Sequence, residues 1–193
     1  MMTDPGTLAH SPRRAADLAR LGEICEALNS SGELDEILNM ILIGVTAGQG
    51  LRFNRAFLLL IDEQEETLRC SHAIGPDNAE EADRVWKELE DKRLTLKEMM
   101  MTSRHETPGV GRRGGRILQS LRVPLAETAH VLVRALQPEG GAKVVRRAEC
   151  DTSSCELVSE NLGVDQFALV PILSRGGPVG VLVADNAITR RPI

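Results

Sequence analysis

Aromatic side chains are scarce in this chain of 193 residues, which has three Phe, one Trp and no Tyr. Few flat rings are therefore left on which nucleic-acid bases or a large planar cofactor could stack. The net charge of −5 also argues against nucleic acid as the main partner. Together these two features disfavour the nucleic-acid-binding class.

Long hydrophobic runs and a leader sequence are also missing. No stretch approaches the ~20 apolar residues that a membrane-spanning helix needs, and the first 19 residues lack the apolar centre of a secretory signal. Four cysteines are too few for a disulfide scaffold in a chain of this size, and without a C-x-x-C-H motif covalent haem is excluded. We therefore expect a cytoplasmic protein without a membrane span, whose thiols are reduced by default.

Composition and length indicate one globular domain. Apolar residues make up 42% and charged residues 26% of the chain, which is the balance of an ordinary folded domain. Residues 1–16 have no periodic pattern and are expected to form a flexible lead-in, so the domain is predicted over residues 17–193. The last residues resemble the approach to a further helix. We therefore expect a fragment of a longer multidomain protein.

Residues 167–186 carry the clearest structural pattern. Two runs rich in Val, Leu and Ile, 167–173 and 179–184, flank a glycine-containing turn and predict an antiparallel hairpin. Neither run alternates polar with apolar residues, which predicts two strands buried on both faces at the centre of a sheet. Pro171 cannot donate to a strand ladder and predicts a bulge, while Gly180 leaves room for another backbone or a ligand.

The rest of the chain predicts an α+β fold with strands near both ends and helices in the middle. Leu68, Cys70, His72 and Ile74 are expected on one face of their strand because they alternate with polar residues. The residue patterns predict these elements: helices over 17–29, 31–47, 78–100, 126–136 and 153–163, strands over 53–61, 68–74 and 143–147, an extended segment over 117–124 and an irregular loop over 102–116.

The closing residues FALVPILSRGGPVGVLVADNAITRRPI resemble the C-terminal hairpin of GAF domains, the small-molecule-sensing modules of bacterial signalling proteins. The resemblance runs from about Asp17 to Ile193. It implies an antiparallel sheet with the leading helices on one face and a ligand cavity under helices and loops on the other. It further implies that the following residues contact the ligand: Cys70, His72, Trp86, Arg116, Arg122, Cys150, Cys155 and Phe167.

The resemblance also implies a function. We expect a non-enzymatic sensor that binds an unidentified small molecule and relays its state to an attached output domain, such as the histidine kinase of a two-component system. Homodimerisation is expected through the terminal helices, because Leu18, Leu21, Cys25 and Leu28 form a short apolar stripe. No cofactor is required by the sequence. A cyclic nucleotide stays possible but unsupported, since Asn54, Arg55 and the residues after them only echo the signature of GAF domains that bind one.

Two other functions remain open. Cys155 is predicted in the first turn of a helix, where a thiolate is stabilised, and Cys150 could approach it to form a reversible disulfide. The chain could thus be a thiol-based redox sensor, or an enzyme resembling free methionine sulfoxide reductases that uses Cys70, Cys150 and Cys155. A metal held by Cys70, His72, Cys150 and Cys155 is a weaker option, because the spacing lacks paired C-x-x-C motifs. The second function is a module that only dimerises.

Overall fold

A six-stranded antiparallel sheet forms the centre of the molecule, with strand order β3-β2-β1-β6-β5-β4. The computed structural model describes residues 22, 34–48, 50–96, 98–99 and 121–193. The first and last strands of the chain meet at the middle of the sheet, where β1 pairs with β6. The strands are β1 (Arg55–Asp62), β2 (Thr67–Ile74), β3 (Arg122–Pro124), β4 (Lys143–Arg146), β5 (Gln166–Ser174) and β6 (Gly177–Asp185).

The predicted closing hairpin is confirmed as β5 and β6, and both strands lie inside the sheet. Pro171 is paired with Val181, and the predicted irregularity follows one residue later, between Ile172 and Leu173. A Cβ atom at Gly180 would collide with the backbone carbonyl of Leu59 on β1, so the close approach expected there is that of a neighbouring strand. Burial on both faces holds for most of β6. In β5 only Phe167 and Leu169 are buried and Leu173 beside the turn is 68% exposed, so the prediction of burial on both faces is wrong for β5.

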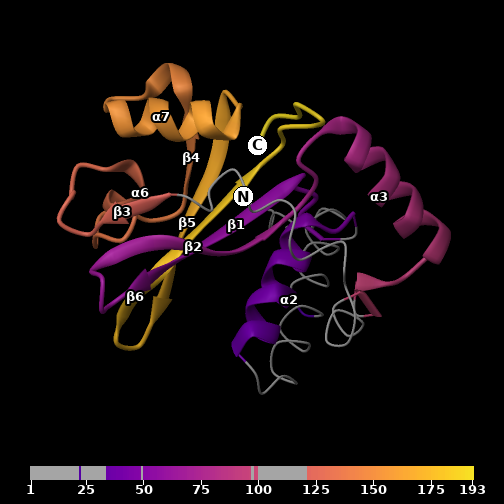
Figure 1. The fold of residues 1–193 in the computed structure, drawn as a ribbon, viewed down its shortest axis with the longest axis horizontal. Coiled ribbons are helices and arrows are strands. Elements are labelled where there is room, and N and C mark those ends of the chain that lie inside the picture. The colour runs from indigo at the N-terminus through magenta and orange to yellow at the C-terminus, as the bar shows by residue number, and fades with distance from the viewer. Residues whose placement is uncertain (1–21, 23–33, 49, 97, 100–120) are drawn as a thin grey trace, which may run out of the picture.

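One face of the sheet is covered by α2 (Leu34–Thr46), as expected for one of the leading helices. Figure 1 shows α2 on one side of the sheet and the pair α6 (Val131–Arg134) and α7 (Ser153–Leu162) on the other. The α2 core contains buried side chains from the helix and the residue after it, from β1, β2 and β6, and from the segment after α3: Leu38, Met40, Leu42, Ile43, Val45, Ala47, Ala56, Leu58, Ile74, Leu96 and Ala184.

The second core lies under α6 and α7. Phe57, Leu59, Phe167 and Leu169 point from the sheet into this face and are fully buried. Leu132 of α6 and Val158 of α7 close the layer from above and are also fully buried. The hydrophobic layers on the two faces explain why β1, which contributes to both, is almost entirely apolar.

Strand β2 contains a bulge that the sequence pattern does not reveal. Leu58 is paired with His72 and Leu59 with Cys70, so Ser71 is the extra residue between them. The bulge turns the following side chains to the opposite faces. The prediction that Cys70 and His72 share a face is therefore wrong: Cys70 packs against the α6–α7 core, whereas the His72 ring reaches Asp35 of α2 at 3.5 Å.

The predicted long helix over 78–100 is interrupted. Helix α3 (Ala79–Lys92) begins at Asn78, whose side chain accepts from the Glu81 N–H, and ends at Arg93 in the left-handed conformation. A new helical turn follows at Thr95, where Thr95 and Glu98 bond reciprocally to each other's backbone N–H groups. Figure 1 shows α3 on the opposite side of the view from α6 and α7.

The middle of the chain follows the prediction in part. The helix expected over 126–136 is reduced to the four residues of α6, preceded by turns in which Glu127 donates to the Pro124 carbonyl. Strand β4 lies at an edge of the sheet, as its charged residues predict. Helix α7 is confirmed and ends at Gly163, although its N-cap is Thr152 rather than Ser153. In the described ranges, no helix is long and apolar enough to cross a bilayer.

Candidate functional site

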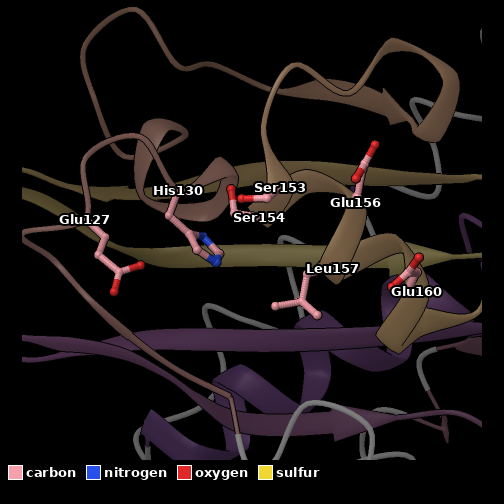
Figure 2. A pocket seen from close by; sticks show the side chains of 7 residues that line it. All are labelled: Glu127, His130, Ser153, Ser154, Glu156, Leu157 and Glu160. Atoms are coloured by element: carbon pink, nitrogen blue, oxygen red, sulfur yellow. The ribbon is translucent and has the colours of Figure 1, made fainter.

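A cleft of about 380 Å³ opens between the turn before α6 and the outer surface of α7. Figure 2 shows Glu127 and His130 on the α6 side facing side chains of α7. The α7 side contributes hydroxyl groups in the first turn and two carboxylates further along the helix. The lining residues are Glu127, His130, Ser153, Ser154, Glu156, Leu157 and Glu160.

The two walls of the cleft are joined by side chains from the loop before α7 and from the first turn of α7. Ser154 Oγ accepts a hydrogen bond from the Val131 N–H at 3.1 Å, which connects the first turn of α7 to the first residue of α6. Arg134 Nη1 donates to Asp151 Oδ2 at 2.8 Å across the same junction. This ion pair holds the pKa of the Asp151 carboxyl below its usual value. The relative position of α6 and α7 therefore depends on residues 151–154.

His130 is the buried polar residue of the cleft, with 8% of its surface exposed. Its Nδ1 accepts from the Leu132 N–H at 3.2 Å and caps α6. Burial lowers the pKa of His130, while the nearby Glu127 carboxylate acts in the opposite direction. The ring is thus held neutral with Nδ1 as acceptor, which leaves the proton on Nε2 as a hydrogen-bond donor.

The remaining charge in the cleft is negative. Glu127, Glu156 and Glu160 supply three exposed carboxylates, of which Glu160 is paired with Arg147 at 2.7 Å. Leu157 is 50% exposed and gives the wall an apolar patch. Such a lining suits a small polar molecule that carries a positive charge, because carboxylates attract the cation while His130 and the serine hydroxyls offer further hydrogen bonds.

A disulfide joins Cys150 and Cys155 at the start of α7, directly beside this cleft. The default expectation of reduced thiols is wrong for this pair, and the alternative of a bond between them is what the structure contains. Cys155 is 3% exposed and belongs to the α6–α7 core, whereas Cys150 is half-buried. The Cys155 N–H donates to Thr152 Oγ1, which places Cys155 in the first turn of the helix.

Cys70 is a free thiol with different properties. It is half-buried against the α6–α7 core, and burial raises its pKa to about 11. Because the thiolate is the nucleophilic and metal-binding form, a thiol with this pKa is inert near neutral pH. Among the residues that the structure describes, no group of three or more His, Cys, Asp or Glu is placed to hold a metal ion.

The other residues predicted to contact a ligand are dispersed. Phe167 is fully buried in the core under α6 and α7. Trp86 is half-buried on α3, and Arg122 lies exposed on the edge strand β3, where it pairs with Glu65 at 2.9 Å. Arg116 lies outside the described residues. The structure therefore brings Cys70, Cys150, Cys155 and Phe167 to one core, and their role in ligand binding stays a prediction.

The residues that line the cleft were not singled out from the sequence as binding residues. Ser153, Glu156 and Glu160 follow a spacing of three and four residues, which places them on one face of a helix. A polar helix face is normally solvated, so this signal alone does not indicate a site. His130 was expected within a helix, whereas it precedes α6 and caps it.

The far end of α7 is bonded to the end of the sheet where the chain leaves β6. Arg55 Nη2 donates to the Leu162 carbonyl at 2.6 Å and to Asp185 Oδ2 at 2.7 Å. Arg190 Nη1 donates to the Gly163 carbonyl at 2.8 Å. Asn54 Oδ1 accepts from the Ile188 and Thr189 N–H groups. Asn54 and Arg55 thus have partners within the protein.

Comparison with known proteins finds similarity in structure only. No family model and no curated protein matches the sequence. The GAF domain of a Coxiella burnetii phosphoenolpyruvate-protein phosphotransferase superposes with a TM-score of 0.53 at 14% identity, covering 91% of this chain and 80% of that one. The phycocyanobilin-bound GAF domain of a cyanobacterial phytochrome gives a TM-score of 0.53 at 14% identity, covering 92% and 82%.

An enzyme is found among the similar structures as well. The free methionine-R-sulfoxide reductase of Neisseria meningitidis, in complex with its substrate, has a TM-score of 0.54 at 17% identity and covers 92% of this chain and 77% of its own. At these identities the likeness establishes the fold and leaves the function open. The order of elements, the central β1–β6 pairing and these superpositions agree: the chain has the fold of a GAF domain.

Proposed function

We propose that this chain is a regulatory domain of a bacterial signalling protein, which binds a small molecule and relays its presence to an attached output domain such as a histidine kinase. The fold supports a sensory role, because several structures that share it are GAF domains, two of them from phosphoenolpyruvate-protein phosphotransferases. The observation that carries the proposal is the position of α7. Its first half lines the cleft, and its last carbonyls hold Arg55 and Arg190.

This arrangement supplies a physical route for the relay. A ligand that draws Glu156 or the first turn of α7 towards α6 shifts a helix whose C-terminal end is hydrogen-bonded to residues 55 and 190. Residues 186–191 are in turn held by Asn54 and Asn186, so the segment that follows β6 responds to the position of α7. A ligand acts only through its different affinity for the two positions.

The chemistry of the cleft indicates a small organic cation. Among the residues that the structure describes, neither Glu127 nor Glu156 forms an ion pair, and the two stand on opposite walls of the cleft. A cationic ligand in the cleft would be attracted by both carboxylates without displacing an existing ion pair. The His130 Nε2–H adds a donor for a carbonyl or hydroxyl oxygen of the same molecule.

Thermal unfolding with a panel of small amines and amino-acid amides tests this assignment. A ligand at about 100 times its Kd stabilises the folded state by ~2.7 kcal/mol, which is about 5–11 °C for a domain of this length. Glu127→Gln together with Glu156→Gln should abolish the shift. Glu139→Gln, an exposed residue that does not line the cleft, is the matched control. Equal shifts in both variants would remove the cleft as the binding site.

A thiol-dependent enzyme is the second candidate, favoured by the Cys150–Cys155 disulfide and by the similarity to a free methionine-R-sulfoxide reductase. The raised pKa of Cys70 counts against Cys70 as the nucleophile. The test is turnover of free methionine sulfoxide with dithiothreitol as reductant. Activity that disappears in Cys155→Ser would support the enzyme, and an inactive reduced wild type would eliminate it.

Three further proposals rest on the sequence. Composition supports a single domain over residues 17–193 and a cytoplasmic location. A homodimer through the terminal helices is proposed from the apolar stripe at Leu18, Leu21, Cys25 and Leu28, which lies outside the described residues. Sedimentation of a chain that starts after Ser30 tests the dimer. An unchanged dimer would exclude the stripe as the contact.

A further inference from the structure

The Cys150–Cys155 disulfide occupies the junction between the cleft and the core. It closes a short loop with a sequence separation of 5, which contains Asp151 and the helix cap Thr152. The residues that connect this loop to α6 lie inside it or next to it, namely Asp151 through Arg134 and Ser154 through Val131. A crosslink at this point constrains the loop through which the α7 wall of the cleft contacts the α6 wall.

The two sulfur-bearing residues are not equivalent. Cys150 is half-buried at the edge of the α6–α7 core and ends the short 3-10 turn before the loop, whereas Cys155 is 3% exposed within that core. Cys150 is therefore the more accessible of the two to an external thiolate. The sulfur that departs is that of Cys155, which lies in the first turn of the ten-residue helix α7 and is the more deeply buried of the two.

We propose that the Cys150–Cys155 disulfide is a reversible redox switch, in which a dithiol reductant attacks Cys150 and reduction loosens the wall of the α6–α7 cleft. This inference deepens the sensory role proposed above and rests on it. It adds a second input, the thiol redox state, to the same structural element.

The exchange reaction balances in two steps. One thiolate of the dithiol attacks Cys150 Sγ, forms a mixed disulfide and expels the Cys155 thiolate, which then takes up a proton from solvent. The second thiol of the reductant, once deprotonated, attacks the reductant sulfur that is bonded to Cys150 in the mixed disulfide. This step releases the Cys150 thiolate, which takes up a proton from solvent. The reductant loses two electrons and two protons and becomes a disulfide, while Cys150 and Cys155 become two thiols.

Reduction has a structural consequence that can be measured. Without the crosslink, the loop that positions Asp151 and Ser154 gains conformational freedom, and only the two contacts to α6 and the core packing hold the start of α7. The central strands β1 and β6 do not depend on this loop. We therefore expect the effect to be confined to α6 and the first turns of α7.

The first experiment uses the full chain with Cys25→Ala and Cys70→Ala, so that the pair is the only source of thiols. The folded protein is incubated with dithiothreitol, trapped with N-ethylmaleimide and weighed by intact mass spectrometry. We expect two maleimide groups to be added without denaturant. Reduction that occurs only in guanidinium would show that the bond is purely structural and would overturn the proposal.

Single-cysteine variants test the direction of attack. Oxidised glutathione should modify Cys150 in Cys155→Ser at least about tenfold faster than it modifies Cys155 in Cys150→Ser, because access controls the rate. Faster modification of Cys155 would contradict the assigned order. Circular dichroism confirms folding of each variant, and the maleimide experiment does not depend on either variant.

Hydrogen exchange of the oxidised and reduced wild type tests the effect on the cleft. The amides of residues 131–134 and 153–157 should exchange on the order of tenfold faster after reduction, the scale set by the chain entropy of so short a loop. The amides of β1 and β6 serve as the internal control. Equal protection in both states overturns the switch. Neither measurement requires a ligand, so amine binding that responds to the cleft variants can succeed or fail separately.

Discussion

The ion pair between Arg55 and Asp185 is predicted to be the most costly single polar interaction to break among the ion pairs of the described residues. Arg55 Nε lies 3.0 and 3.2 Å from the two Asp185 carboxylate oxygens, and Nη2 lies 2.7 Å from one of them. The two side chains are 4% and 0% exposed. Removing one partner leaves a buried charge without compensation, which costs ~3–5 kcal/mol.

Arg55→Met tests this magnitude, because it keeps much of the side-chain length but removes the charge and the bond to the Leu162 carbonyl. For a domain of this length the expected loss corresponds to a Tm lower by about 6–20 °C. Arg122→Met is the matched control: its pair with Glu65 is also short, at 2.9 Å, but the side chains are 56% and 55% exposed. An exposed pair contributes only about 0–1 kcal/mol.

Urea unfolding followed by circular dichroism gives both free energies on the same scale. We expect the free energies of unfolding of the Arg55 and Arg122 variants to differ by at least ~2 kcal/mol. Equal losses would refute it, because they would mean that burial does not determine the cost. A stable Arg55→Met/Asp185→Leu double variant is also expected, since replacing both partners by apolar groups leaves no charge unpaired.

Three further changes have defined outcomes. Because burial lowers the pKa of His130, the unfolded chain binds a proton first as the pH falls below ~6.5, so stability present at higher pH is lost on acidification. His130→Asn keeps an acceptor for the cap and should make the free energies of urea unfolding at pH 5 and pH 7.5 more alike. An unchanged pH dependence in this variant would contradict the assignment. Gly180→Ala should lower stability by ~1–3 kcal/mol in thermal unfolding because its Cβ meets the Leu59 carbonyl, whereas Gly176→Ala, whose Cβ meets only Ser174 Oγ at 3.7 Å, should be within ~0.5 kcal/mol. Asn78→Ala removes the cap of α3 and should cost about 1 kcal/mol, with loss of helical circular dichroism; no loss would show that the cap is dispensable.

Local patterns in the sequence predict much of the fold. The hairpin of β5 and β6, the apolar face of α2, the Asn78 cap of α3 and the Gly163 end of α7 all follow from residues within one element or next to it. The break after α3 also had a local signal, since Thr95 and Glu98 have the spacing of a capping box. That signal was hidden by apolar residues that continue at helical spacing across it.

Other features depend on contacts between distant segments. The bulge at Ser71 is set by how β2 pairs with β1, and nothing in the alternation of β2 alone indicates that Cys70 and His72 diverge. The short α6 forms where His130 caps it and Ser154 holds its first N–H, although the surrounding residues favour a longer helix. The cleft is formed by the turn before α6 together with α7, so it could not be identified from either segment alone.

The α6–α7 cleft is the centre of the account, and native mass spectrometry of the chain purified from cells that naturally produce it tests it most directly. We expect a bound small molecule that is lost on denaturation, that carries a basic nitrogen, and that is retained by Glu139→Gln. The same molecule should be absent from the variant with Glu127→Gln and Glu156→Gln. Retention by that double variant, or a wild-type chain that carries no molecule, would contradict the account.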